Sequence, residues 1–166
     1  MIKIGLISDT HGTISRRTLS FFEPVNEIWH AGDIGTVALA DELAGLKPFR
    51  AVYGNIDDRV LRRMFPGCSR FYCEDVEVLM THISGYPGRY SPAIRRELGI
   101  RSPSLLIGGH SHILKVMYDK KHECLFMNPG AAGNKGFHRV CTALRFCIDG
   151  KRISDLEVLE FERTRF

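Results

Sequence analysis

Residues of the types that bind divalent metal ions occur in short clusters along this chain. Oxygen and imidazole ligands without thiolate suit Mn, Fe, Zn or Ni better than Ca or Cu(I). The clusters contain two carboxylates, one amide and four imidazoles: Asp9, His11, Asp33, Asn55, His82, His110 and His112. This set is about what two divalent ions need when one carboxylate bridges them. Paired ions can stabilise the attacking and leaving oxygens of an in-line displacement at phosphorus.

Each cluster taken alone also has an ordinary structural explanation. Gly-Asp and Gly54-Asn55 are common turn pairs, and an Asp-x-His after a strand is frequent. A single histidine such as His82 is more often a hydrogen-bonded core residue. The pair His110 and His112 carries more weight, because alternate residues of an extended segment place both imidazoles on one side. The joint occurrence of the clusters favours a metal site.

The clusters need strands and helices to bring them together, and the first half of the chain predicts alternating elements. Strands are expected at 2–8, 27–31 and 49–53, and helices at 15–22, 37–46 and 58–64. This order favours a parallel sheet with helices over its faces. Asp9, Asp33 and Asn55 then follow the carboxyl ends of the strands, where ligands bind in open α/β sheets.

The second half of the chain has a different pattern and is mostly strand. A helix is expected at 91–98, ended by Gly99. Turn residues are expected at 119–122 and 149–150. Strands are expected at 70–74, 76–81, 104–107, 114–119, 124–127, 140–148 and 154–161. An α/β half followed by a β-rich half predicts two packed sheets with helices outside.

Composition excludes several classes of protein. The chain has 166 residues, 44% hydrophobic and 25% charged, which predicts one globular domain over 1–166. No apolar run approaches the ~18 residues of a membrane span, and the apolar N-terminus is too short for a signal peptide. The net charge of +4 comes from scattered doublets, so there is no strong signal for nucleic acid. The five cysteines contain no C-x-x-C, so we expect reduced thiols in a cytoplasmic protein.

The clusters, in their order along the chain, resemble the motifs of the calcineurin-like metallophosphoesterase superfamily. The matching segments are Asp9-x-His11, Gly32-Asp33, Gly54-Asn55, His82 and Gly109-His110-x-His112. The small size and the Asn128-Pro-Gly130 turn are most similar to its compact bacterial and archaeal phosphodiesterase branch. The resemblance implies an α/β fold, a four-layer αββα sandwich of two mixed β-sheets flanked by helices.

The resemblance also implies a ligand set and a reaction. One metal ion would be held by Asp9, His11, Asp33 and His112. Asp33 would bridge to a second ion, completed by Asn55, His82 and His110. A bridging hydroxide would then attack a phosphodiester that is a small molecule or a nucleotide, with Asp33, Asn55 and His82 as catalytic residues. Manganese is the expected metal, and Zn, Fe, Ni and Mg are the alternatives.

Several positions depart from the family pattern or lie outside it. Many members have a histidine directly after the Gly-Asn pair, as a proton donor or a phosphate contact, whereas this chain has Ile56, which can do neither. Asp57 is expected near the ligands, orienting an imidazole. His122 and His138 are expected to face solvent, with contact between His138 and substrate as the alternative for that residue. The Gly- and aromatic-rich segment 83–90 is either a substrate wall or an ordinary loop.

Ile56 keeps a second function open, a non-catalytic binding or scaffold protein on the same fold. The complete ligand set favours the enzyme. A nuclease would need an extended basic groove or a capping domain, and neither is visible in the sequence. A homo-oligomer is compatible with the sequence.

Overall fold

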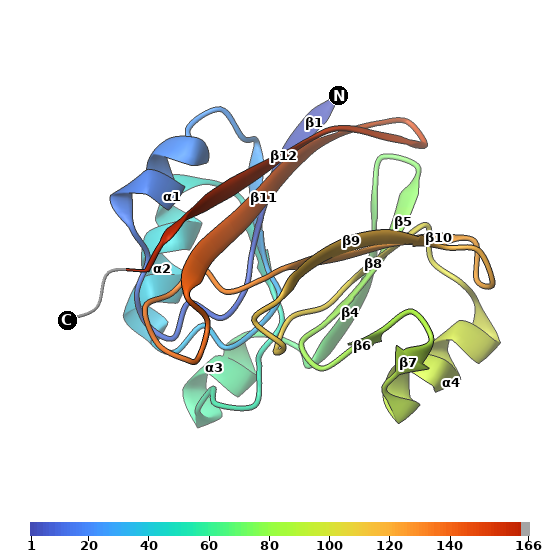
Figure 1. The fold of residues 1–166 in the computed structure, drawn as a ribbon, viewed down its shortest axis with the longest axis horizontal. Helices are drawn as coiled ribbons and strands as arrows, with labels where there is room; N and C mark the ends of the chain where they lie inside the picture. Colours follow the sequence, from blue (N-terminus) through green and yellow to red (C-terminus); the bar gives the residue numbers. More distant parts are fainter. Residues whose placement is uncertain (164–166) are drawn as a thin grey trace.

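The computed structural model describes residues 1–163, so residues 164–166 of the expected 1–166 domain lie outside the described part. Two mixed five-stranded sheets face each other (Figure 1). The first has the spatial order β12 (Arg152–Glu162), β11 (Val140–Asp149), β1 (Ile2–Ile7), β2 (Glu27–His30) and β3 (Phe49–Ala51). The second has the order β4 (Cys68–Cys73), β5 (Val76–Thr81), β8 (Leu105–Ile107), β10 (Cys124–Pro129) and β9 (Leu114–Asp119).

Helices cover the outer faces of the two sheets (Figure 1). They are α1 (Arg16–Phe21), α2 (Val37–Leu46), α3 (Arg59–Met64) and α4 (Pro92–Ile100). Helices α1 and α2 lie outside the first sheet and α4 lies outside the second, which confirms the expected four-layer sandwich. None of the described helices is long and apolar enough to span a membrane.

Three apolar layers hold the sandwich together. Trp29 and Phe146 of the first sheet meet Leu105 of the second in the central layer. Leu43 of α2 packs on the outer face of the first sheet, and Ile94 of α4 packs on the outer face of the second. Inner strands such as β1 and β8 are covered on both faces, so they appear in the sequence as mostly apolar runs. The parallel triplets β1–β2–β3 and β5–β8–β10 place several strand ends at one edge of the molecule.

Two local predictions differ from the structure. The expected stop at Gly99 is wrong, because α4 continues to Ile100 and its C-cap is Arg101, in an extended conformation. Gly99 is not among the residues with positive φ, so it does not form the left-handed cap that favours glycine. The segment 83–90 contains a small hairpin that the sequence pattern did not indicate, β6 (Gly85–Tyr86) and β7 (Arg89–Tyr90).

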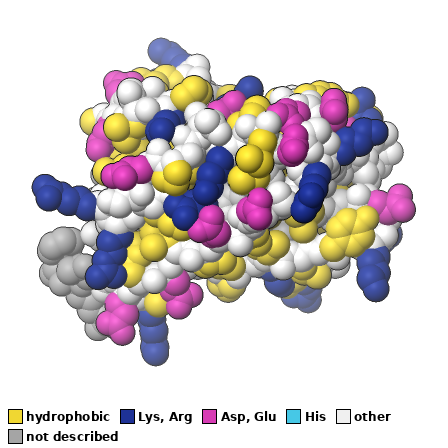
Figure 2. Space-filling view, turned by 90° about the horizontal axis from the view of Figure 1, so that it is seen from above, with side chains coloured by type: hydrophobic (Ala, Val, Ile, Leu, Met, Phe, Trp, Pro, Cys, Tyr) yellow, Lys and Arg dark blue, Asp and Glu magenta, His cyan; other side chains and the backbone are white. Residues whose placement is uncertain are grey.

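The opposite edge of the molecule, where β1 begins, is seen from above in Figure 2. Lys and Arg side chains are interspersed there with Asp and Glu, so this face is not dominated by one sign of charge. The polar clusters that the sequence singled out lie at the other edge, where the parallel strands end. The five cysteines are free thiols, and Cys68 is the exposed one.

Candidate metal centre

The structure brings the predicted ligand residues together at the carboxyl ends of β1, β2, β5 and β8. Two groups have ligand atoms within 4.8 Å of one another. The first group is Asp9, His11 and His112, and the second is Asp33, His82 and His110. The seventh predicted ligand, Asn55, lies beside the second group, with its Oδ1 3.0 Å from His110 Nδ1. Loops separated by up to about a hundred residues of sequence therefore meet at one place.

The backbone of these loops is unusual in the same residues that carry the ligand atoms. Asp9, His11, Asp33, His110 and His112 all have φ between 48° and 69°. A positive φ is uncommon for residues other than glycine and costs free energy unless the surrounding structure enforces it. Such strain is concentrated at functional sites. The backbone thus identifies the same residues as the side-chain chemistry does.

Asp9 is held so that one carboxylate oxygen faces the centre. Its Oδ2 accepts hydrogen bonds from the Ser8 hydroxyl at 2.7 Å and from the His110 N–H at 3.0 Å. Its Oδ1 lies 3.1 Å from His112 Nε2 and has no hydrogen-bond partner in the described part of the chain. Ser8 is a residue that the sequence analysis missed, although its position directly before the aspartate at a strand end was a usable signal.

In Asp33 too, one carboxylate oxygen is hydrogen-bonded to the protein and the other faces the centre. Its Oδ1 accepts from the Ile56 N–H at 3.0 Å. Its Oδ2 lies 3.6 Å from His11 Nε2 and 3.2 Å from His82 Nε2, so it lies close to imidazoles of both groups. Gly54 is required beside it, because a Cβ there would come within 2.0 Å of Asp33 Oδ1.

Hydrogen bonds set the tautomers of two ligand imidazoles. His82 Nδ1 donates to the Ala31 carbonyl at 2.8 Å, which leaves Nε2 facing the two carboxylates. His138 Nε2 donates to the Gly133 carbonyl at 2.7 Å, so its Nδ1 is an acceptor when the ring is neutral. His112 Nδ1, at 3.0 Å from that nitrogen, then donates to it and keeps its own Nε2 free to bind a metal. The expectation that His138 faces solvent is therefore wrong.

Asp57 lies next to the ligand-bearing loops as expected, but the prediction that it orients an imidazole is wrong. Its carboxylate contacts backbone rather than an imidazole: it accepts from the N–H groups of Ile34, Gly35 and Gly54 at 2.8–3.2 Å. These residues belong to the loops that carry Asp33 and Asn55. Asp57 thus fixes two ligand-bearing loops to each other, because a buried carboxylate with several N–H donors binds them firmly.

Electrostatics separate the ligand histidines from the neighbouring core histidine. Burial lowers the pKa of His30 to about 3, so this ring is neutral; its Nδ1 accepts from the Gly32 N–H and its Nε2 contacts Thr10. Burial acts in the same direction on His82, but the carboxylates of Asp33 and Asp9 outweigh it and raise the pKa of His82. Burial alone would raise the pKa of Asp9, yet the nearby imidazoles of His11 and His112 hold it well below its usual range.

These observations test whether divalent ions fit the residues present. Asp9 Oδ1, His11 Nε2 and His82 Nε2 are buried, face one another and have no hydrogen-bond partner within residues 1–163. Buried polar atoms are almost always paired, and the exceptions call for an explanation such as an ion. All the donors are oxygen or imidazole nitrogen, the types that divalent first-row metals bind. The residues fit a metal centre.

Comparison with known proteins agrees with this site. The model of the calcineurin-like phosphoesterase superfamily domain matches residues 2–151. The chain therefore belongs to the calcineurin-like phosphoesterase superfamily. A probable metallophosphoesterase of Methanothermobacter thermautotrophicus is 32% identical over 134 residues, which are 77% of this chain and 76% of that protein.

Solved structures share the fold at lower identity. An archaeal phosphodiesterase has a TM-score of 0.73 and 21% identity, covering 95% of this chain and 100% of that one. Wild-type Vps29 of Entamoeba histolytica, solved in complex with Zn²⁺, has a TM-score of 0.74 and 15% identity, covering 98% and 100%. These likenesses establish the fold, and the family establishes a phosphoesterase domain.

Proposed function

We propose that this protein is a dimetal-dependent phosphodiesterase. One observation carries the proposal: two ligand groups share a centre at which three buried polar atoms have no partner within the described chain. The archaeal phosphodiesterase of the same fold supports the choice of substrate class.

The proposed ligand sets follow the two groups. One ion would be held by Asp9, His11 and His112, the other by His82, His110 and Asn55, and Asp33 would contact both. When bound, such ions act as Lewis acids toward the phosphoryl oxygens and lower the pKa of a bound water toward about 7. The chain itself aims Asp33 Oδ2 at the centre, because the Ile56 N–H holds the other oxygen.

The leaving group must depart without help from residue 56. The Ile56 side chain is exposed at the rim of the centre and has no proton to donate. General acid catalysis is typically worth about 10²–10⁴-fold, and its absence affects poor leaving groups most. We therefore expect aryl phosphodiesters to be cleaved, aryl monoesters to be cleaved more slowly, and the rate to depend steeply on the pKa of the leaving group.

The test is turnover of bis(4-nitrophenyl) phosphate by protein stripped with EDTA and then reloaded with Mn²⁺ or Zn²⁺. We expect the stripped protein to be inactive and the reloaded protein to regain activity. Metal content should be measured in parallel by elemental analysis. Full occupancy of both sites together with no turnover of any aryl phosphodiester would refute the enzymatic function.

That same outcome would support a non-catalytic binding or scaffold protein, the alternative function. Ile56 favours this alternative, since it puts an apolar side chain where a proton donor often stands. The complete ligand set and the strained backbone that carries it favour the enzyme. The expected manganese loading, the cytoplasmic location and a homo-oligomer stay predictions.

A further inference from the structure

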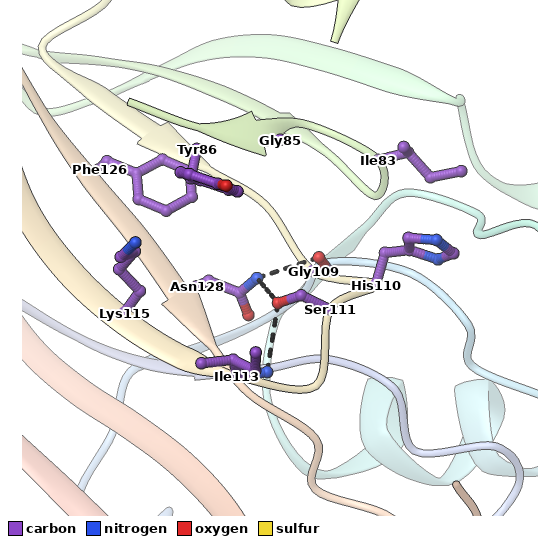
Figure 3. A pocket seen from close by; sticks show the side chains of 10 residues that line it. All are labelled: Ile83, Gly85, Tyr86, Gly109, His110, Ser111, Ile113, Lys115, Phe126 and Asn128. Carbon is purple, nitrogen blue, oxygen red and sulfur yellow. Dashed lines mark hydrogen bonds between the residues drawn. The ribbon is translucent and has the colours of Figure 1, made fainter. Parts of the chain in front are cut away.

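A pocket of about 400 Å³ adjoins the metal centre on the side of the second ligand group. Its floor is the outer face of β10, where Phe126 is buried. Its walls come from the β6–β7 hairpin, through Tyr86, and from the loop after β8, through Ile113 (Figure 3). His110 lines the pocket and also belongs to the ligand group, so an occupant of the pocket lies next to a phosphorus bound at the centre.

The side-chain amide of Asn128, on the floor of the pocket, is already engaged within the protein. Asn128 donates to the Gly109 carbonyl at 3.0 Å and to the Ser111 hydroxyl at 3.1 Å, and its Oδ1 accepts from the Gly130 N–H. The Ser111 hydroxyl also accepts from the Ile113 N–H at 3.2 Å. Figure 3 shows the hydrogen bonds that join Asn128, Gly109, Ser111 and Ile113 among the residues lining the pocket. The Ser111 O–H and the Lys115 ammonium group are therefore the donors left for a ligand, whereas both N–H groups of Asn128 are used within the protein.

Apolar and aromatic side chains make up most of the exposed surface of the pocket. Tyr86 and Ile113 keep 40% and 66% of their surface exposed, although each borders the pocket. Lys115 lies opposite Asn128 in the pairing of β9 with β10, and its Nζ lies 4.4 Å from the centre of the Tyr86 ring. A cation over a ring is attracted to its face and fixes its orientation. Tyr86 thus offers a held aromatic surface at the edge of the metal centre.

We infer that this pocket binds a planar aromatic ring carried by the phosphoryl substrate, either an aryl group or a nucleobase. The ring would lie against Tyr86 and Ile113 while its phosphorus group is held at the metal centre. Such a site binds the ring by stacking on its face and by removing it from water. It therefore accepts rings with different hydrogen-bonding groups at their edges. This inference rests on the proposed function, since the metal centre is what anchors the phosphorus group.

Binding affinities, measured with a first pair of ligands that cannot be hydrolysed, separate the pocket from turnover. Phenylphosphonate and methylphosphonate carry the same phosphorus group, and their P–C bond survives a phosphoesterase. We expect zinc-loaded protein to bind phenylphosphonate about tenfold more tightly in calorimetry, since an aromatic contact adds to burial of the ring. A second pair, adenosine 5′-monophosphate and ribose 5-phosphate, tests a nucleobase that is separated from phosphorus by a sugar.

Three variants test whether the tighter binding of the ring-bearing ligand comes from this pocket. Tyr86→Ala should reduce the preference in the responsive pair to less than about twofold, and Ile113→Ser should weaken it. Both residues are on the surface, so folding is not at risk. Tyr72→Ala, which truncates an exposed tyrosine of β4 outside the pocket, is the matched control and should keep the preference.

The outcomes distinguish this inference from the proposed function. The pair that shows a gain dependent on Tyr86 identifies the ring as aryl or nucleobase. Equal affinity within both pairs, or a preference that survives Tyr86→Ala and Ile113→Ser, overturns the inference alone. Failure of every ligand to bind the zinc-loaded protein also overturns the inference, because the phosphorus group is then not anchored at the centre. Turnover of bis(4-nitrophenyl) phosphate decides separately on the proposed function.

Discussion

Two buried clusters in this protein combine aspartate with histidine, and they differ in how completely their atoms are paired. One is the metal centre. The other, far along the second sheet at the turn between β9 and β10, contains Asp119, His122 and Tyr90. Asp119 Oδ2 contacts the Tyr90 hydroxyl at 2.6 Å and His122 Nδ1 at 2.8 Å, and its Oδ1 accepts from the N–H groups of Lys121 and His122.

Asp119 thus has hydrogen-bond partners for both oxygens, whereas each central aspartate has one oxygen turned toward unpaired imidazoles. The backbone differs in the same way, because Asp119 and His122 have no positive φ while five residues of the metal centre do. His122 is expected to face solvent, yet the structure binds it to Asp119, so that prediction is wrong. The comparison teaches that residue type alone does not identify a ligand site; the atoms left without partners do.

The largest expected effect is on catalytic activity, which should depend on Asp33 and not on Asp119. Asp33→Asn keeps an oxygen for the Ile56 N–H but removes the charge that would contact both ions, so turnover should fall by at least about a hundredfold. Asp119→Asn, the matched control, should leave kcat/KM for an aryl phosphodiester within about twofold. Near wild-type activity in Asp33→Asn at full metal occupancy would contradict the assignment of this residue.

The next effect is on metal affinity, and it compares His138, which contacts a ligand histidine, with His122, which contacts Asp119. His138→Phe removes the acceptor that keeps His112 in its metal-binding tautomer, and such outer partners are typically worth about 10–100-fold in metal affinity. His122→Phe should leave the affinity unchanged. Calorimetric titration with Zn²⁺ measures both, and equal affinities in the two variants would show that His138 does not position the ligand.

The free energy of unfolding should be affected more by Asp119→Asn than by Asp33→Asn, the reverse of their order in activity. Asp119→Asn disturbs a fully paired buried carboxylate, so the free energy of unfolding should fall by about 1–3 kcal/mol. Metal-free Asp33→Asn should lose less, because the asparagine oxygen can still accept the Ile56 N–H hydrogen bond and the buried charge is removed. Urea unfolding of the stripped proteins provides the comparison. A larger loss in Asp33→Asn would mean that the centre is held together by its own polar contacts without metal.

The smallest effect is a dependence on pH. Burial alone would raise the pKa of Asp119, but Tyr90 and His122 lower it below its ordinary 3.8. A lowered carboxyl pKa stabilises the fold above the unfolded value, and this stabilisation is lost as pH falls through the folded value. The difference in urea midpoint between the wild type and Asp119→Asn should therefore be constant from pH 7 to about 5 and narrow at lower pH. A difference that widens toward acid would mean that folding raises the pKa of Asp119 rather than lowering it.

Much of the site was predictable because its signals are local. Apolar runs ending in Asp9, Asp33 and Asn55 predicted strands that carry ligands at their carboxyl ends, and the alternation of the first half predicted the parallel strands. Both depend on patterns within a few residues. The stop at Gly99 shows where such patterns fail, since glycine near a helix end adopts a positive φ only if the following chain requires it.

The sequence by itself determined the order of the elements and the types of donor available at the strand ends. Tertiary structure decided which of those atoms are left without a partner. His138 reaches His112 because β11 pairs with β1 and brings its preceding loop against the centre. Asp57 binds backbone of the Asp33 loop because β2 and β3 are neighbours. Hydrogen bonds between distant segments depend on chain topology, and local periodicity contains no information about that pairing.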